Sequence, residues 1–344
     1  MKFTDEAFFN AIRDFLTVYL PRQKCYSDNT VRSYRITLNL LVDYLTESKN
    51  LPLYKLSFGD VSAESVSGFL DWLQSERRCS PSTRNQRLMA VRSFLNYASS
   101  INTEYVSRQI EVSHVPIQKT QGKTVDFLSE DALKALLAQP DQRKRTGIRN
   151  AFFMTLMYDT AARCQEMLDL KWRDFELDVP HPYVRLTGKG NKTRTVPLMD
   201  KTREMLNFYA GHFHNNENRK SDNYIFYTVI HENRCQMSPD TVAVFMKKYG
   251  EEAKKSCPGM PDRVHPHQLR HTRAIHLYRS GFPLALLSEF LGHTHVETTR
   301  IYAYADTEMK REAILKADPK NLAVQEEAVW KGDDETIKKL YGLI

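Results

Sequence analysis

The sequence has few of the residues that build disulfide-rich, fibrous or low-complexity proteins. Only 13 Gly and 14 Pro occur among its 344 residues, so collagen-like and wholly disordered classes are excluded. Its five cysteines are odd in number and far apart, and no two form a CxxC pair. This pattern indicates neither a disulfide framework nor a four-cysteine zinc site, and it favours a reducing compartment.

Long hydrophobic runs are missing as well. The most apolar stretch, AFFMTLMY at 151–158, is far shorter than the roughly 20 residues that a membrane span needs. The start, MKFTDEAFFNAIRDF, has acids among its first six residues and no long apolar core, so we expect no secretory signal. We therefore expect a cytoplasmic protein without a membrane partner.

Basic residues outnumber acidic ones, 49 to 42, for a formal net charge of +7. The excess permits an anionic partner without requiring one. It is divided unevenly: residues 1–120 carry +3, residues 121–305 carry +6 and residues 306–344 carry −2. The last segment is therefore not a basic arm for nucleic acid.

Apolar spacing predicts a helical first domain over residues 1–115. Apolar residues recur every three or four positions in 31–45 and again in 82–98. Ser80 and Pro81, just ahead of the second stretch, are typical of a helix start. Two further helices, near 8–20 and 64–73, complete the expected bundle.

A polar, aperiodic stretch at 116–125 is the expected linker to a second domain, 126–344. Ser129, followed by two acids, opens a run of helical patterns. One interruption, YVRLTGKGNKTRTVPL at 183–198, predicts a hairpin with a Gly-Lys-Gly-Asn tip. The expected fold class is mainly α, in two domains, with a small β-hairpin or sheet.

Short segments of the second half carry side chains suited to one reaction. DTAARCQEMLDLKW at 159–172 contains an Arg-x-x-Glu pair, and HPHQLRHTRAIHL at 265–277 places a histidine and an arginine on one helix face. LGHTHVETTRIYAY at 291–304 has a histidine and, nine residues later, a tyrosine. With the lysine of the hairpin tip, the candidates are Arg163, Glu166, Lys189, His267, Arg270, His293 and Tyr302.

Taken singly, these residues have ordinary interpretations: a surface ion pair, a solvated turn lysine, capping histidines and a core tyrosine. Zinc binding is a further alternative, because six of the eleven His residues fall between 265 and 295. His267 and His271 have i, i+4 spacing, but no HExxH pattern or nearby cysteine completes a site, and arginines among the histidines would repel a cation. We expect no metal and no other cofactor.

Taken together, the candidates suit phosphoryl transfer rather than acyl or glycosyl chemistry. Arginine forks bind phosphate oxygens bidentately and keep their charge. A tyrosine hydroxyl can attack phosphorus and form an ester that stores the phosphodiester energy for rejoining. Lysine and histidine can move the protons, so that no metal is required.

In order and spacing, the motifs resemble the tyrosine recombinases, or phage integrase family. The matching motifs are RxxE followed by LKW, GKGNKTRTVPL, HxLRHT, LGH and TTxIYxY, over about 123–305. The N-terminal bundle is more weakly similar to the family's SAM-like core-binding domain. The resemblance, closest to Xer-type recombinases and mobile-element integrases, implies a C-shaped clamp on double-stranded DNA, in the cytoplasm on the bacterial nucleoid.

The resemblance implies site-specific recombination through a 3′-phosphotyrosyl link to Tyr302. Lys189 would protonate the leaving 5′-oxygen, and His267 would assist proton transfer at the nucleophile. Tyr304 is an alternative nucleophile by proximity. However, two residues turn about 200° on a helix, so the two tyrosines face opposite ways, and the interval from His293 favours Tyr302.

The remaining candidates would hold DNA. By the resemblance, Arg163 and Arg270 grip the scissile phosphate, His293 hydrogen-bonds it, and Glu166 braces the site. The sequence departs from the family at Ala161, where glycine is common, which is a mild change. The expected DNA-binding residues are Arg84, Arg87, Arg92, Lys192 and Arg194. For the first three, the alternative is a solvated helix face.

The tail, 333–344, has an amphipathic pattern in Ile337, Leu340, Tyr341 and Ile344. A helix this short is marginal alone, so its face must dock. The resemblance implies exchange between protomers of a tetramer on DNA, with docking in cis as the alternative. For the whole protein we expect integration, excision or transposition of a mobile element. The alternatives are Xer-type dimer resolution, a type IB topoisomerase and an inactive DNA-binding regulator.

Overall fold

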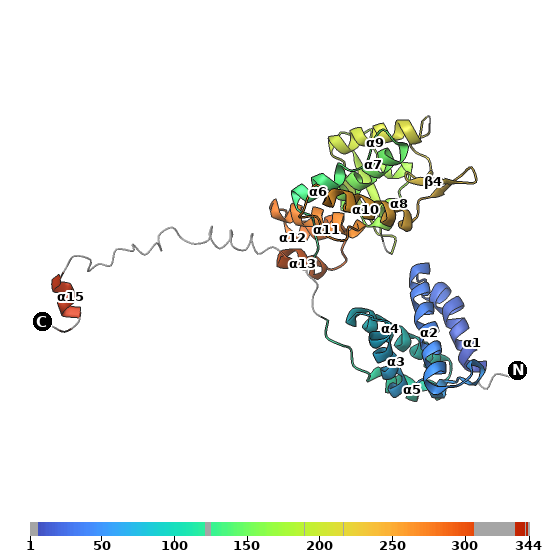
Figure 1. The fold of residues 1–344 in the computed structure, drawn as a ribbon. Helices are drawn as coiled ribbons and strands as arrows, with labels where there is room; N and C mark the ends of the chain where they lie inside the picture. The colour runs from blue at the N-terminus through green and yellow to red at the C-terminus, as the bar shows by residue number, and fades with distance from the viewer. Residues whose placement is uncertain are drawn as a thin grey trace. The chain divides into compact units, whose positions relative to one another are not determined.

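The computed structural model describes residues 6–120, 125–188, 190–215, 217–305, 334–340 and 342. The chain divides into two compact units, Met1–Gly122 and Lys123–Ile344, and Figure 1 shows the elements of each. Both are mainly helical, as predicted. Within the described residues, no helix is long and apolar enough to cross a membrane.

The first unit is a helical bundle in which the helices beginning at residues 28, 63 and 81 follow serine caps. The side chains of Ser27, Ser62 and Ser80 each accept a hydrogen bond from the backbone N–H three residues later. All four helices predicted here are present, and the first continues as a π-helix. The elements are α1 (Glu6–Asp14), η1 (Phe15–Gln23), α2 (Asp28–Lys49), η2 (Leu53–Lys55), η3 (Phe58–Asp60), α3 (Ala63–Ser75), α4 (Pro81–Ile101), η4 (Thr103–Tyr105) and α5 (Val106–Ser113).

Aromatic rings fill the centre of this bundle. The centroid of the Phe94 ring on α4 lies 5.5 Å from that of Phe15 and 5.9 Å from that of Phe58. Phe8 of α1 joins the same group at 6.2 Å. Aromatic burial on this scale supplies much of a small domain's stability, and here it anchors α4.

The second unit combines helices with two small sheets. The predicted hairpin is present as β2 and β3, with Thr187 opposite Thr193. It belongs to an antiparallel sheet of order β1-β2-β3. The elements are α6 (Glu130–Leu137), α7 (Arg145–Thr160), α8 (Cys164–Leu168), η5 (Trp172–Asp174), β1 (Phe175–Glu176), β2 (Tyr183–Thr187), β3 (Thr193–Pro197), α9 (Asp200–Phe213), β4 (Tyr227–Ile230), β5 (Asn233–Gln236), α10 (Pro239–Lys254), α11 (Pro266–Arg279), α12 (Leu284–Leu291), η6 (Val296–Thr298), α13 (Arg300–Ala305) and α15 (Asp334–Leu340).

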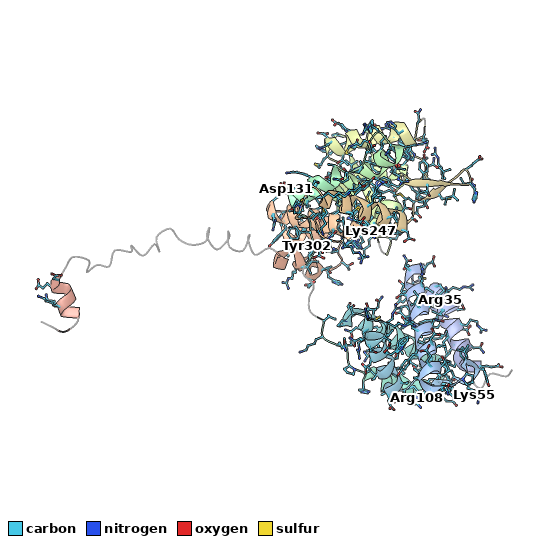
Figure 2. All side chains as sticks on the ribbon, viewed as in Figure 1. Arg35, Lys55, Arg108, Asp131, Lys247 and Tyr302 are labelled. Atoms are coloured by element: carbon cyan, nitrogen blue, oxygen red, sulfur yellow. The ribbon has the colours of Figure 1, made fainter. Side chains whose placement is uncertain are left out.

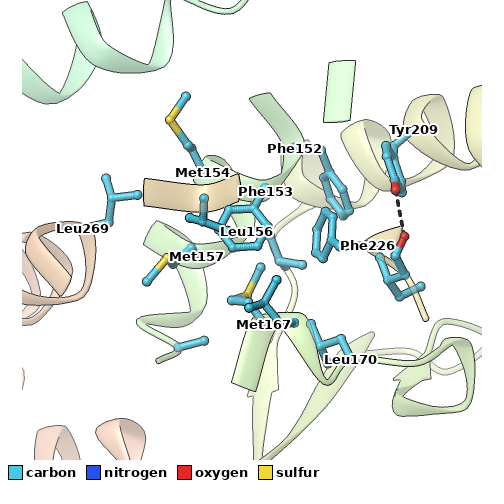
Figure 3. Close-up of a cluster of buried hydrophobic side chains, with 14 of the residues drawn as sticks. Phe152, Phe153, Met154, Leu156, Met157, Met167, Leu170, Tyr209, Phe226 and Leu269 are labelled. Carbon is cyan, nitrogen blue, oxygen red and sulfur yellow. Dashed lines mark hydrogen bonds between the residues drawn. The ribbon is translucent and has the colours of Figure 1, made fainter. Parts of the chain in front are cut away.

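The main core of the second unit lies around α7, most of whose residues are buried. Figure 3 shows Phe152 and Met157 of this helix in one cluster with Tyr209 and Phe226. The Tyr209 hydroxyl donates a hydrogen bond to the Ile225 carbonyl oxygen at 2.7 Å, so that its polar end is satisfied inside the core.

A smaller apolar cluster joins α11, α12 and α13. Ile275 of α11 and Leu291 of α12 pack there with Ala161, the residue that ends α7, and with Tyr302 of α13. Figure 2 labels Tyr302 on α13. Because its ring is only 1% exposed, this packing fixes the direction of the Tyr302 hydroxyl relative to α11.

Candidate active site

Arg270 is the most constrained cation of the site. It is 4% exposed, and it donates hydrogen bonds of 2.7 Å to the carbonyl oxygens of Ala161 and Leu291. Burial, with the charges of Arg163 and Arg194, lowers its pKa to about 10. Arg270 therefore remains charged at neutral pH and is held in one place by two chain segments.

The turn at Ala161 makes the first of these bonds possible. Ala161 has a φ of 47°, in the left-handed region that favours glycine. This conformation ends α7 and lets the carbonyl accept from Arg270. The turn thus forms with alanine at the position where the sequence departs from the family.

His293 is bonded on both sides of its ring. Its Nε2 lies 3.0 Å from Arg270 Nη2 and its Nδ1 lies 2.8 Å from Thr299 Oγ1. Because arginine can only donate, Nε2 accepts and Nδ1 carries the proton to Thr299. Burial, followed by the charges of Arg270 and Arg163, lowers the pKa of His293 to about 4, so the ring is neutral.

Glu166 joins the two remaining arginines. It accepts bonds from Arg163 Nη1 at 2.6 Å and from Arg194 Nη2 at 2.8 Å, and its side chain is 3% exposed. Burial alone would raise its pKa, but the hydrogen bonds and charges of Arg194, then Arg163, lower the pKa to about 2. The sequence analysis predicted Arg194 as a DNA-binding residue and did not predict its ion pair with Glu166.

The β2–β3 hairpin is attached to the same carboxylate. Arg194 lies on β3, and Gly188, at the end of β2, approaches so closely that an added Cβ would lie 2.8 Å from Glu166 Oε1. Lys189 follows directly and lies outside the described residues. Lys192, two residues before Arg194, is exposed on the same hairpin.

Tyr302 and His271 form the remaining polar pair. The Tyr302 hydroxyl lies 2.9 Å from His271 Nδ1. Burial raises the pKa of Tyr302, whereas the charges of Arg270 and Arg163 oppose that rise, so the phenol is within electrostatic reach of both arginines. Sequence reasoning missed His271 as this partner because helical spacing does not show which element packs above α11.

His267, the predicted proton-transfer residue, lies one helical turn before His271 and is exposed. Partial burial of its ring and the charges of Arg270, His265 and Arg163 lower its pKa. It therefore borders the arginine cluster.

The structure brings together Arg163, Glu166, Arg194, Arg270, His293, His267 and Tyr302. The side chain of Tyr304 lies outside the described residues.

A cavity of about 820 Å³ opens beside the arginines. Its lining does not include Tyr302, which stays covered by its own cluster. Among the described residues, no group of three or more His, Cys, Asp or Glu is arranged to hold a metal ion. The polar part of the cavity lining includes Arg163, Arg194 and His293. The apolar part includes Phe282, Leu286 and Phe290.

The arginines predicted on α4 do not form a solvated face. Arg84 is 5% exposed and donates to the Pro116 carbonyl oxygen at 3.2 Å. Arg87 donates to Thr37 Oγ1 at 2.7 Å, and Arg92 donates to the carbonyl oxygen of Ser113 at 2.7 Å. All three guanidiniums brace the bundle, and phosphate contacts by them stay a prediction.

Family models match both units. The phage integrase N-terminal SAM-like domain matches residues 12–102, and the phage integrase family model matches residues 126–309. The chain belongs to the phage integrase family. Its members are tyrosine recombinases, enzymes that cleave and rejoin DNA, and the buried tyrosine and clustered arginines belong to the matched range of this integrase-family chain.

Curated relatives of this family member match nearly its whole length. An integrase/recombinase of Sinorhizobium fredii, y4rC, is 30% identical over 90% of this chain and 91% of its own. The tyrosine recombinase XerD of Staphylococcus epidermidis is 28% identical over 90% of this chain and 98% of its own. Integrases and Xer recombinases are therefore both among its relatives.

Solved structures share the integrase-family fold. The XerH recombinase in its post-cleavage complex with difH DNA has a TM-score of 0.62 at 20% identity, covering 84% of this chain and 80% of that one. The Tn1549 transposon integrase bound to transposon right end DNA has a TM-score of 0.65 at 14% identity, covering 89% and 98%. At these identities the likeness concerns the fold.

Proposed function

We propose that this chain is a site-specific DNA recombinase that cuts and rejoins DNA through a 3′-phosphotyrosyl link to Tyr302. The observation that carries the proposal is the fixed Arg270 guanidinium, which stays charged within electrostatic reach of Arg163 and of the Tyr302 hydroxyl. A rigid cation beside a buried phenol offers a phosphate grip and a nucleophile in one place.

The reaction forms one bond and breaks another. Tyr302 Oη attacks phosphorus, and the bond from phosphorus to the 5′-oxygen breaks. Lys189 gives a proton to the leaving 5′-oxygen, while a neighbouring histidine takes the phenolic proton. His267 is the histidine that the sequence suggests. Joining reverses these steps, because the phosphotyrosyl ester keeps the energy of the phosphodiester.

The other site residues hold the phosphate or support its grip. Arg163 and Arg270 bind the scissile phosphate, and Glu166 keeps Arg163 in position. His293 hydrogen-bonds the phosphate through Nε2 after its proton moves to that nitrogen, because in the described state Nε2 accepts from Arg270 and Nδ1 is paired with Thr299. The site works without a metal because its arginines supply the positive charge.

DNA is held between the two domains, which we assign as 1–115 and 126–344 with 116–125 as linker, closing as a C-shaped clamp. The division of the chain into two compact units supports the assignment of two domains, and the clamp follows from the family resemblance alone. Lys192 is exposed at the cavity, and among the described residues it is the strongest candidate for a phosphate contact. Acting on DNA, the protein would work in the cytoplasm, on the nucleoid.

Recombination requires several protomers, and we propose a tetramer whose tails, 333–344, pass to neighbouring subunits. Helix α15 (Asp334–Leu340) lies within this tail. The acidic excess after residue 305 suits protein rather than DNA contact. The apolar side chains on which the docking face depends lie outside the described residues.

We further propose integration, excision or transposition of a mobile element as the biological setting. The relative at 30% identity is named an integrase/recombinase, which supports this. Xer-type resolution of chromosome or plasmid dimers is the second candidate, favoured by the similarity to XerD over 98% of that chain. The DNA sequence to which the protein becomes covalently attached distinguishes the two settings. It would lie at the ends of a mobile element in the first and at a chromosome or plasmid dimer-resolution site in the second.

The test is a covalent trap. Sheared genomic DNA of the source strain is incubated with the purified protein and denatured with detergent, and DNA attached to protein is sequenced to find the site. A duplex of that sequence with a nick beside the cleavage position then prevents rejoining. We expect a protein–DNA adduct that Tyr302→Phe abolishes and EDTA leaves intact.

Tyr304→Phe is the matched control and should form the adduct at the wild-type rate. An adduct that persists in Tyr302→Phe would place the nucleophile elsewhere, and no adduct with any fragment would overturn the recombinase proposal. Two-site DNA should yield exchanged strands, whereas relaxation of supercoiled plasmid without any site would favour a type IB topoisomerase.

A further inference from the structure

We infer that His271, rather than His267, takes the proton of Tyr302 during strand cleavage and returns it during joining. The inference rests on the proposed nucleophile. Its basis is contact: His271 Nδ1 lies 2.9 Å from the Tyr302 hydroxyl, with the rings at a centroid distance of 5.7 Å. A general base must be within hydrogen-bond reach of the proton that it removes, and His271 already is.

Helix α11 directs neighbouring side chains to different tasks. Successive residues on a helix point about 100° apart. Arg270 therefore reaches the carbonyl oxygens of Ala161 and Leu291, while His271 reaches α13. One rigid helix thus places the phosphate-binding cation and the proton acceptor one residue apart, and a shift of α11 would move both together.

The protonation state of the unbound site suits this role. His271 is neutral, since burial and the charges of His267, Arg270 and His265 lower its pKa to about 4, opposed by Asp126. A neutral imidazole has a lone pair for the phenolic proton. Nδ1 is then the acceptor and the proton sits on Nε2.

Bound DNA strengthens this base. The groups around His271 are His267 and Arg270 of α11, His265 at the N-cap of that helix, Asp126 of the segment before α6, and Tyr302 of α13. The negative scissile phosphate offsets the arginine charge that makes protonated His271 unfavourable. The pKa of His271 then rises toward the neutral range at which a general base is most effective.

Every proton is accounted for in both cleavage and joining. In cleavage, the Tyr302 oxygen bonds to phosphorus, the phenolic proton moves to His271 Nδ1, and the 5′-oxygen leaves with a proton from Lys189. In joining, the 5′-hydroxyl gives its proton back to Lys189 and attacks phosphorus, the bond from phosphorus to the Tyr302 oxygen breaks, and His271 returns its proton to the departing phenol. His267, exposed one turn earlier beside the arginines, is then free to contact the phosphate.

The experiment compares two substitutions in single-turnover cleavage of the nicked duplex. His271→Asn places an amide oxygen near the position of Nδ1, so it keeps an acceptor but cannot take a proton at neutral pH. His271→Ala removes both the hydrogen-bond acceptor and the group that can take a proton. We expect both variants to cleave about 100-fold more slowly or worse, within the usual range for a lost general base, and to lose the acid limb of the pH–rate profile.

A matched control lies on the same helix. The Tyr158 hydroxyl lies 2.9 Å from His276 Nδ1, and both residues line a second cavity whose lining does not include Arg163, Arg194 or Arg270. His276→Asn breaks an equivalent tyrosine–histidine bond and should cleave at close to the wild-type rate. Thermal unfolding of all variants checks that each is folded under the assay conditions.

A second measurement separates proton transfer from structural support. DNA ending in a 3′-p-nitrophenyl phosphate replaces the phosphotyrosyl bond with one whose leaving group needs no proton. With Tyr302→Phe in the background, adding His271→Asn should leave joining of this DNA unchanged. If His271 instead holds Arg270 and the other phosphate-binding groups in place, His271→Asn would slow this joining as much as it slows cleavage, and that result would overturn the inference.

Other outcomes also decide. Wild-type cleavage by His271→Asn would mean that His271 only orients the hydroxyl, and faster cleavage by His271→Ala would mean that it restrains the nucleophile. Either result overturns proton transfer by His271 while the Tyr302-dependent adduct stands. Loss of that adduct in the unmodified protein would instead remove the proposed function.

Discussion

At the scale of single residues, Glu166 is a buried acid whose charge depends on its two arginines. Its pKa is about 2 in the folded protein, against an ordinary 4.5. The ionised form is therefore favoured by folding, and the stabilisation is complete above about pH 4.5. It is lost as the pH falls toward 2, and at neutral pH it amounts to about 3 kcal/mol.

Glu166→Gln should remove that stabilisation. We expect the unfolding temperature Tm of the second unit to fall by roughly 6–12 °C at pH 7. The difference in Tm from wild type should shrink as the pH is lowered from 5 to 2. Differential scanning calorimetry across this range measures both effects. Glu204→Gln, an exposed acid on α9, is the control, and a constant difference at every pH would contradict the prediction.

Individual site residues were predictable where chemistry restricts the residue type. Arg163, Arg270, His293 and Tyr302 were proposed from the sequence because phosphoryl transfer needs cations and a nucleophile, which stand here in a recognisable order. His271 was not, because its importance comes from a contact between α11 and α13. Arg92 was predicted to contact DNA, with a solvated helix face as the alternative, and its bond to the Ser113 carbonyl oxygen was missed because sequence does not show which carbonyl oxygens need a donor.

At the scale of elements, the β2–β3 hairpin is set against Glu166 by a glycine. An added Cβ at Gly188 would lie 2.8 Å from Glu166 Oε1 and 3.5 Å from Arg163 Nη1. Glu166 is held by hydrogen bonds from both of its arginines and is unable to move aside. The hairpin would have to lift instead, at a cost of about 1–3 kcal/mol.

Gly188→Ala should therefore lower both stability and cleavage rate, since Lys189 is the next residue. Thermal unfolding and single-turnover cleavage measure the two. Gly211→Ala is the control: nothing lies within 4 Å of its added Cβ on α9, and the helix should gain up to about 1 kcal/mol. Equal behaviour of the two variants would show that the close approach to Glu166 has no consequence.

Elements were predictable where their signals are local. The β2–β3 hairpin has β-prone arms around glycines, and α4 starts at Ser80 and Pro81. The β4–β5 hairpin was missed because His231 and Glu232, at its turn, adopt φ values of 46° and 65° without a glycine. The turn signal on which such a prediction depends is absent there.

At the scale of the whole molecule, we predict that assembly on DNA depends on the tail, 333–344. Deleting residues 332–344 should abolish multimer formation on two-site DNA while leaving binding to one site intact, because we assign that segment to contact with a neighbouring protomer. Light scattering and gel shifts with one-site and two-site duplexes measure the two properties.

Substitutions that keep the chain length sharpen this test. Ile337→Asp and Leu340→Asp should act like the deletion, since they place charge on the predicted apolar face. Lys338→Gln, at an exposed position of α15, should assemble as wild type. Unchanged assembly of the deleted protein would mean that the tail docks on its own subunit.

The charge of the arginine cluster has a consequence for the direction of catalysis. Arg163, Arg194 and Arg270 carry three positive charges, Glu166 removes one, and the neighbouring His271 and His293 are neutral. The described groups therefore sum to +2. A DNA phosphodiester carries a single negative charge, whereas the five-coordinate phosphorus formed during attack carries two. We therefore expect this charge to stabilise the species midway through the proposed reaction more than the substrate, and because both directions pass through that species, it would accelerate cleavage and rejoining equally.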